Sequence, residues 1–214
     1  MGKLGLGCLA ILVVLAVIIG ISLAGTYNRL VTLGQDVDRS WAEVENQYQR
    51  RADLVPNLVQ TVQGAANFEK DTLTQVTEAR ASVGRANITP GTAPASPEAL
   101  ARYQQAQDQL GSALQRLLVV SERYPELRAN QNFRDLQAQL EGTENRITVA
   151  RGRFNDSAQQ YNTVLKRFPT NMLAGLFNMK EKPYFKATTA GAEQAPRVQF
   201  NFGATPAPAA TPAH

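Results

Sequence analysis

Apolar side chains recur with a helical period along most of the chain. The longest run has an apolar or aromatic residue at every seventh position: Phe133, Leu140, Ile147, Phe154, Tyr161 and Phe168. This spacing places one apolar stripe along the side of a helix. Asn130 or Asn132 is suited to cap the start of the helix, and Pro169 cannot continue it. The pattern therefore predicts a helix over residues 130–168.

Three further stripes predict three further helices. The first predicted helix covers residues 27–65, and Pro56 inside it removes a backbone hydrogen bond, which predicts a kink near that proline. A weaker stripe predicts a helix over residues 68–86. The third covers residues 97–123, where Ser96 is suited to be the N-cap and Pro97 to open the first turn.

These stripes predict an all-α fold. No segment between residues 27 and 166 alternates with period two, as a half-buried strand would. Amphipathic helices bury their apolar faces most simply against each other, which predicts a long antiparallel four-helix bundle within residues 26–186. A three-helix bundle, whose first helix continues through Gly64, is the alternative. Residues 87–97 (NITPGTAPASP) are expected to form a flexible linker.

The N-terminal segment predicts a membrane anchor over residues 1–25. Residues 4–24 carry no charge, and a helix of about 20 apolar residues crosses a bilayer core. A cleaved signal peptide is the alternative, although its apolar core has only about 7 to 15 residues. Ala16, Gly20 and Ala24 would share one helix face, where another membrane helix can approach closely. The basic residues that flank the segment are too few to orient it.

The composition of the chain excludes several kinds of functional site. Cys8 and His214 are the only cysteine and histidine, so neither an intramolecular disulfide nor a Cys/His metal cluster can form. The net charge of +4 is scattered, with no basic stripe for a nucleic acid. Glu-x-x-His pairs, a Walker loop and a nucleophile elbow do not occur. We therefore expect no catalytic, metal-binding or cofactor-binding residues.

Two dense polar clusters are candidates for interaction or for fixing the bundle register. The first predicted helix carries Glu45, Asn46, Arg50, Arg51 and Asp53, and the last carries Glu144, Asn145 and Arg146. In antiparallel helices the two clusters would lie at similar heights, where they would form a buried polar layer. A solvated face with pairs along each helix is the alternative.

The C-terminal region holds the only strand-like pattern. Val198, Phe200 and Phe202 alternate with polar residues, which suggests a short strand at 196–202 within a tail over residues 187–214. A single strand leaves its backbone groups unpaired, so this one would add to a strand of a second subunit or partner. A disordered tail is the alternative. The apolar stretch 172–185 is expected to fold back on the bundle or to touch the membrane surface.

Several motifs together resemble the LemA family of bacterial membrane-anchored proteins. They are WAEVENQYQRRADLVPNLV at 41–59, TEARA at 77–81, YPELRAN at 124–130, LEGTENRI at 140–147 and PYF at 183–185. The resemblance spans roughly residues 4–202, and it implies one N-terminal membrane helix, a helical bundle and no enzymatic activity. At residues 87–97, where the family pattern has a short connection, this chain has a tract of Pro, Thr and Ala.

These observations predict a single-pass protein of the bacterial inner membrane that acts by binding. It would be a scaffold or adaptor for other envelope proteins, and homo-oligomeric. The alternative is a structural protein that assembles into a homo-oligomeric ring or array. A remoter alternative is an enzyme with an unrecognised carboxylate site.

Replacing Gly20 by Leu is expected to weaken self-association of the apolar segment in detergent by roughly fivefold, because a large side chain separates the packed backbones. Energy transfer between labelled copies at increasing detergent dilution measures the effect. Ile18→Leu, which lies off the small-residue face, is the matched control. Equal association of both variants would contradict the prediction.

Overall fold

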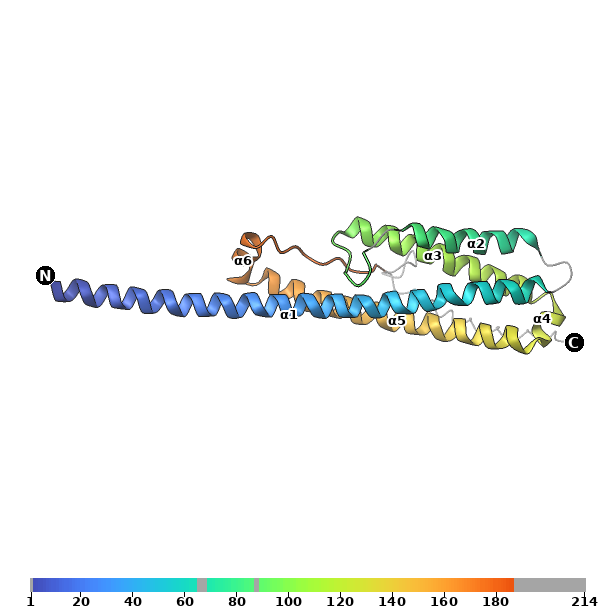
Figure 1. Ribbon diagram of the computed structural model, residues 1–214, viewed down its shortest axis with the longest axis horizontal. Helices are drawn as coiled ribbons and strands as arrows, with labels where there is room; N and C mark the ends of the chain where they lie inside the picture. Colours follow the sequence, from blue (N-terminus) through green and yellow to red (C-terminus); the bar gives the residue numbers. More distant parts are fainter. Residues whose placement is uncertain (1, 65–68, 87–88, 187–214) are drawn as a thin grey trace, which may run out of the picture.

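The computed structural model describes residues 2–64, 69–86 and 89–186, and it is an elongated bundle with a single helix projecting from one end (Figure 1). Every regular element in these ranges is a helix, which confirms the all-α prediction. The helices are α1 (Gly2–Gln63), α2 (Lys70–Arg85), α3 (Pro97–Ser121), α4 (Pro125–Ala129), α5 (Gln131–Lys166) and α6 (Thr170–Leu176). The suggested strand 196–202 lies outside the described residues.

The four long helices form two antiparallel pairs. α1 packs along α5, and α2 and α3 form a hairpin that lies over one half of the α1–α5 pair (Figure 1). The direction of α5 follows from side-chain contacts, since Ser40 meets Ser157 at 2.7 Å whereas Arg51 meets Glu144 at 2.7 Å. α1 runs without interruption from the apolar segment through Pro56 to Gln63, so the expected anchor and the bundle share one helix.

Local sequence explains where α3 and α5 begin. The Ser96 hydroxyl accepts a hydrogen bond from the backbone N–H of Ala99 at 3.2 Å, and Pro97 occupies the first turn of α3. The Asn130 side chain accepts from the N–H of Phe133 at 3.3 Å and caps α5. Both caps were expected from the sequence.

The core follows the predicted stripes, with one exception. Trp41 is fully buried, with its ring 5.5 Å from that of Phe154 and stacked 6.0 Å from that of Phe185. Five residues of the sevenfold run are buried: Phe133, Leu140, Ile147, Phe154 and Tyr161. The sixth, Phe168, is 80% exposed. Extending the stripe to Phe168 was therefore wrong, because α5 ends at Lys166 and the chain turns away.

The tract between α2 and α3 was predicted to be flexible, and its described part, residues 89–96, is instead packed on the bundle. The backbone N–H of Ala93 donates to the Asp38 carboxylate at 3.0 Å, and that of Gly91 donates to Glu45 at 2.8 Å. Gly91 has a φ of +73°, which glycine adopts without strain. Ala93 lies in the core with 3% of its surface exposed. Two carboxylates of α1 thus hold a loop whose composition suggested mobility.

After α6 the chain returns along α5, held by two asparagine side chains. The Asn162 amide donates to the carbonyl of Lys182 at 2.8 Å and accepts from its N–H at 2.8 Å. The Asn155 amide binds Phe185 in the same two-way manner, at 3.2 and 2.9 Å. The two asparagines are seven residues apart and therefore share a face of α5. They satisfy an extended backbone that has no strand beside it.

Replacing Asn162 by Ala is expected to speed hydrogen exchange of the Lys182 amide by roughly tenfold or more, because that N–H loses its acceptor. Exchange at Phe185, which Asn155 holds, should change less. NMR-detected exchange measures both amides in one sample. Gln159→Ala removes an exposed amide from the same helix and is the control. Equal protection of the Lys182 amide in both variants would show that the Asn162 side chain does not hold the returning segment.

Candidate functional site

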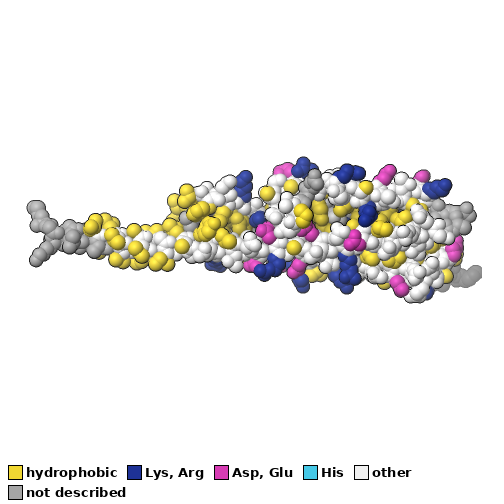
Figure 2. Space-filling model, in the orientation of Figure 1, with side chains coloured by type: hydrophobic (Ala, Val, Ile, Leu, Met, Phe, Trp, Pro, Cys, Tyr) yellow, Lys and Arg dark blue, Asp and Glu magenta, His cyan; other side chains and the backbone are white. Residues whose placement is uncertain are grey.

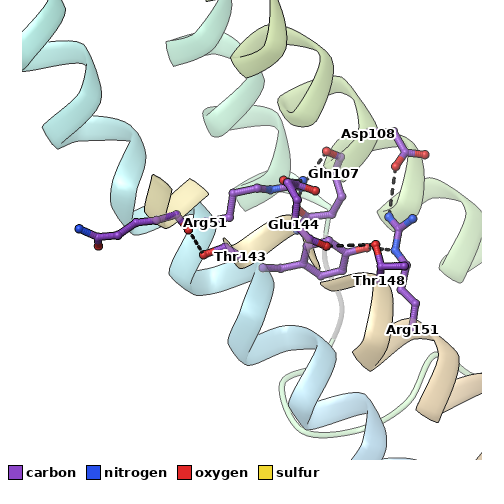
Figure 3. A network of polar contacts seen from close by, with 9 residues as sticks. Arg51, Gln107, Asp108, Thr143, Glu144, Thr148 and Arg151 are labelled. Atoms are coloured by element: carbon purple, nitrogen blue, oxygen red, sulfur yellow. Dashed lines mark hydrogen bonds and ion pairs between the residues drawn. The ribbon is translucent and has the colours of Figure 1, made fainter. Parts of the chain in front are cut away.

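Arg51 lies at the centre of a polar layer that joins three helices and is buried at Arg51 and Gln107, whereas the Glu144 side chain is 49% exposed. Arg51 projects from α1 with only 3% of its surface exposed. One terminal nitrogen, Nη1, donates to the Glu144 carboxylate of α5 at 2.7 Å. The other, Nη2, donates to the Gln107 backbone carbonyl at 2.8 Å and to its side-chain oxygen at 2.6 Å, on α3 (Figure 3). One guanidinium of α1 therefore contacts residues of α3 and α5 at the same height along the bundle.

The neighbours of Arg51 make room for this guanidinium. Gly111 faces it, and a Cβ atom added there would lie 3.4 Å from Nη1. The Tyr48 ring lies 5.2 Å from the Arg51 guanidinium carbon, within the range of a cation–π contact. Among the residues that the structure describes, none accepts a hydrogen bond from the buried Nε of Arg51. A longer side chain at position 111 would therefore press on a group that is already fully enclosed.

A second arginine extends the layer along α5. Arg151 donates from Nη2 to Asp108 at 3.1 Å (Figure 3). Its Nε donates to the Tyr48 hydroxyl at 2.5 Å. Its guanidinium also lies 5.5 Å from the Tyr48 ring centre, so two cations flank this tyrosine. Burial raises the pKa of Tyr48, although both arginines oppose the shift. Burial likewise raises the pKa of the adjacent Tyr103 to about 12. Both phenols are therefore neutral at physiological pH.

The predicted polar clusters divide between the layer and the surface. Arg51 and Glu144 meet in the polar layer, and Glu45 binds the α2–α3 loop. Arg50 and Asp53 are exposed, and Asp53 accepts from Gln49 of the same helix at 2.8 Å. The remaining three, Asn46, Asn145 and Arg146, are exposed and line a hollow between α1 and α5.

The layer also contains residues that sequence reasoning missed, namely Gln107, Asp108 and Arg151. The sequence does contain an indication that Gln107 is buried. Gln107 follows Tyr103 by four residues and precedes Leu110 by three, so it falls on the apolar face of α3. Arg51 likewise falls between Tyr48 and Val55 on the apolar face of α1. A long polar residue at such a position needs a buried partner.

The hollow between α1 and α5 is lined by both polar and apolar side chains. Its volume is about 470 Å³, and its lining is Glu43, Asn46, Gln47, Asn145, Arg146, Val149, Ala150 and Arg153. The Val149 side chain, which lines the hollow, is 54% exposed. The side-chain oxygen of Gln47 is buried and has no hydrogen-bond partner among the described residues.

The N-terminal part of α1 has the length and composition of a membrane span. The part of α1 from Ile11 onward includes an 18-residue window with a mean hydropathy of 2.1. No residue of this window is buried. Apolar side chains cover this rod in Figure 2, whereas charges are distributed over the bundle. Gly20, between Ala16 and Ala24, has no atom within 4 Å of the position of an added Cβ. The face of α1 at Gly20 is therefore not covered by other described residues.

Fold and surface together define a membrane-associated protein with an elongated helical bundle. In the part of the chain that the structure describes, no three His, Cys, Asp or Glu side chains converge as metal ligands. The chain belongs to the LemA family, whose model matches residues 40–200. The matched region includes the layer, the hollow and the returning segment after α6.

The chain is also similar to magnetosome proteins. It is 26% identical to magnetosome protein MamQ 2 of Paramagnetospirillum magneticum (strain AMB-1) over 212 residues, which covers 88% of this chain and 76% of the relative. It is 25% identical to magnetosome protein MamQ of Magnetospirillum gryphiswaldense (strain MSR-1) over 184 residues, covering 77% of this chain and 66% of the relative.

Replacing Arg51 by Leu is expected to lower the free energy of unfolding by about 2–4 kcal/mol, since Gln107 is left buried without its donor. Arg50→Leu, one residue earlier and exposed, should change it by less than about 0.5 kcal/mol. Urea unfolding of the two variants measures the difference. Equal midpoints would place the Arg51 side chain in solvent.

Proposed function

We propose that this chain is a single-pass protein of the bacterial inner membrane whose bundle is a non-enzymatic scaffold or adaptor for other envelope proteins. The observation that carries the proposal is the continuity of α1, which runs as one helix from Gly2 to Gln63. A bundle built on the same helix as the span stands on the membrane without a flexible linker. Its sides are then held at a constant orientation to neighbouring proteins, which reduces the entropy lost on binding.

The charged groups of the layer are already used within the bundle. Arg51 and Arg151 bind Glu144, Asp108, Gln107 and Tyr48. Such pairs fix register, as a polar residue at a core position does in coiled coils. A bundle whose two central arginines are paired mainly within it is suited to present a surface. The similarity to magnetosome proteins is compatible with this role.

The α1–α5 hollow is the surface that we assign to partner binding. It combines the exposed Val149 side chain with three exposed polar side chains. These are the amides of Asn46 and Asn145 and the guanidinium of Arg146. Protein interfaces typically combine apolar and polar groups in this way.

Self-assembly is the second candidate function, and the same hollow supports it, because a second copy of the chain could fill it. The open face of Ala16, Gly20 and Ala24 would add a contact within the membrane. Val198, Phe200 and Phe202 remain candidates for strand addition between subunits.

A photo-crosslinking residue at position 149 is expected to capture other envelope proteins in intact cells, identified by mass spectrometry. The same residue at position 119 is the matched control, since Val119 is 61% exposed on α3. Capture of further copies of this chain alone would favour the ring or array. Yields at 149 no greater than at 119 would contradict a binding role for the hollow.

A further inference from the structure

A group of large apolar side chains is exposed around α6. Phe168 is 80%, Met172 69%, Leu176 77% and Phe177 51% exposed. These four residues, called here the α6 patch, lie within ten positions of the chain. Large apolar patches on soluble surfaces are uncommon and mark contacts with proteins or membranes.

The α6 patch lies at the height where the apolar segment of α1 ends. The Phe177 ring is 4.8 Å from the ring of Tyr27, which follows the uncharged residues 4–24. α6 packs on both α1 and α5. Leu23 is half-buried, whereas residues 11–22 are exposed, so the folded part begins inside the apolar segment. Figure 2 shows apolar side chains continuing from the projecting rod onto the wider region where α6 lies.

We propose that the α6 patch is inserted in the interfacial region of the bilayer that α1 crosses, at the boundary between lipid headgroups and acyl chains. The proposal rests on the span stated under the proposed function. If residues 4–24 fill the hydrocarbon core, Tyr27 lies among the headgroups, where tyrosine is enriched in membrane proteins. Phe177 contacts Tyr27 and therefore lies at the same depth.

The charges bordering the patch fit a lipid surface. Lys166, Arg167 and Lys180 are exposed at its edge. The Lys166 ammonium pairs with the Glu181 carboxylate at 2.8 Å. The side chains of Arg167 and Lys180 are exposed to solvent. Basic side chains next to inserted apolar ones bind lipid phosphates and favour anionic lipids. The occupant of the patch is therefore lipid, and insertion adds a second membrane contact beside the span.

Single-cysteine variants of the full chain in lipid vesicles test the proposal. In a Cys8→Ala background, an environment-sensitive fluorophore is attached at Met172→Cys or Leu176→Cys, with lipids that carry a nitroxide near the headgroup as quenchers. Ile18→Cys reports on the span, and Val119→Cys, 61% exposed on α3, is the control in solvent. We expect at least threefold stronger quenching at 172 and 176 than at 119. Circular dichroism confirms that each variant is folded.

Each outcome separates the two proposals. Quenching at 18 by lipids labelled deep in the acyl chain, with 172 and 176 no more quenched than 119, overturns the interfacial insertion and leaves the span. No quenching at 18 by the deep label overturns both. Protection of 172 and 176 from aqueous iodide that disappears at low protein-to-lipid ratio would show that a second copy covers the patch, and it would overturn lipid insertion.

Discussion

The antiparallel packing of α1 on α5 is the contact on which the other features depend. Trp41, Tyr48 and Phe154 are buried along it, and Ser40 meets Ser157 near one end while Arg51 meets Glu144 further along. A slip by one helical turn would move every apolar residue of α1 by about 5.4 Å relative to α5. The α2–α3 hairpin, the α2–α3 loop and the returning segment 179–186 all dock on this pair, so its register sets theirs.

The polar layer makes such a slip costly. Apolar stripes with a repeated spacing pack almost equally well in neighbouring registers, whereas the Arg51 guanidinium finds Glu144 and Gln107 in only one. Breaking these contacts leaves buried polar groups without partners. On the proposed role in register, Arg51 would favour one arrangement of the helices over its neighbours as well as contribute to stability.

If the apolar segment spans the membrane as proposed, the continuity of α1 ties the bundle to the membrane without a flexible linker. Because one helix includes both the apolar segment and the core residues of the bundle, the orientation of the span and that of the α1–α5 hollow are linked. Contact of the α6 patch with lipid would further restrict tilt and rotation about the span axis. A surface that faces a constant direction is what a scaffold of neighbouring proteins needs, and the same property would favour a regular array.

The helices, their caps and most of the core follow from local patterns. Sevenfold apolar spacing, Ser96 and Asn130 act within a few residues, so they are readable without knowing which segments meet. The stripe failed at Phe168, where the end of α5 turns the side chain into solvent. Residues 89–96 looked mobile because the carboxylates of Asp38 and Glu45 that hold them lie some 50 positions earlier. The partners of Arg51, the asparagine clamp on 182–185 and the meeting of Phe177 with Tyr27 likewise join distant positions. Such pairings depend on which helix faces overlap in space, and periodicity along one segment carries no information on that.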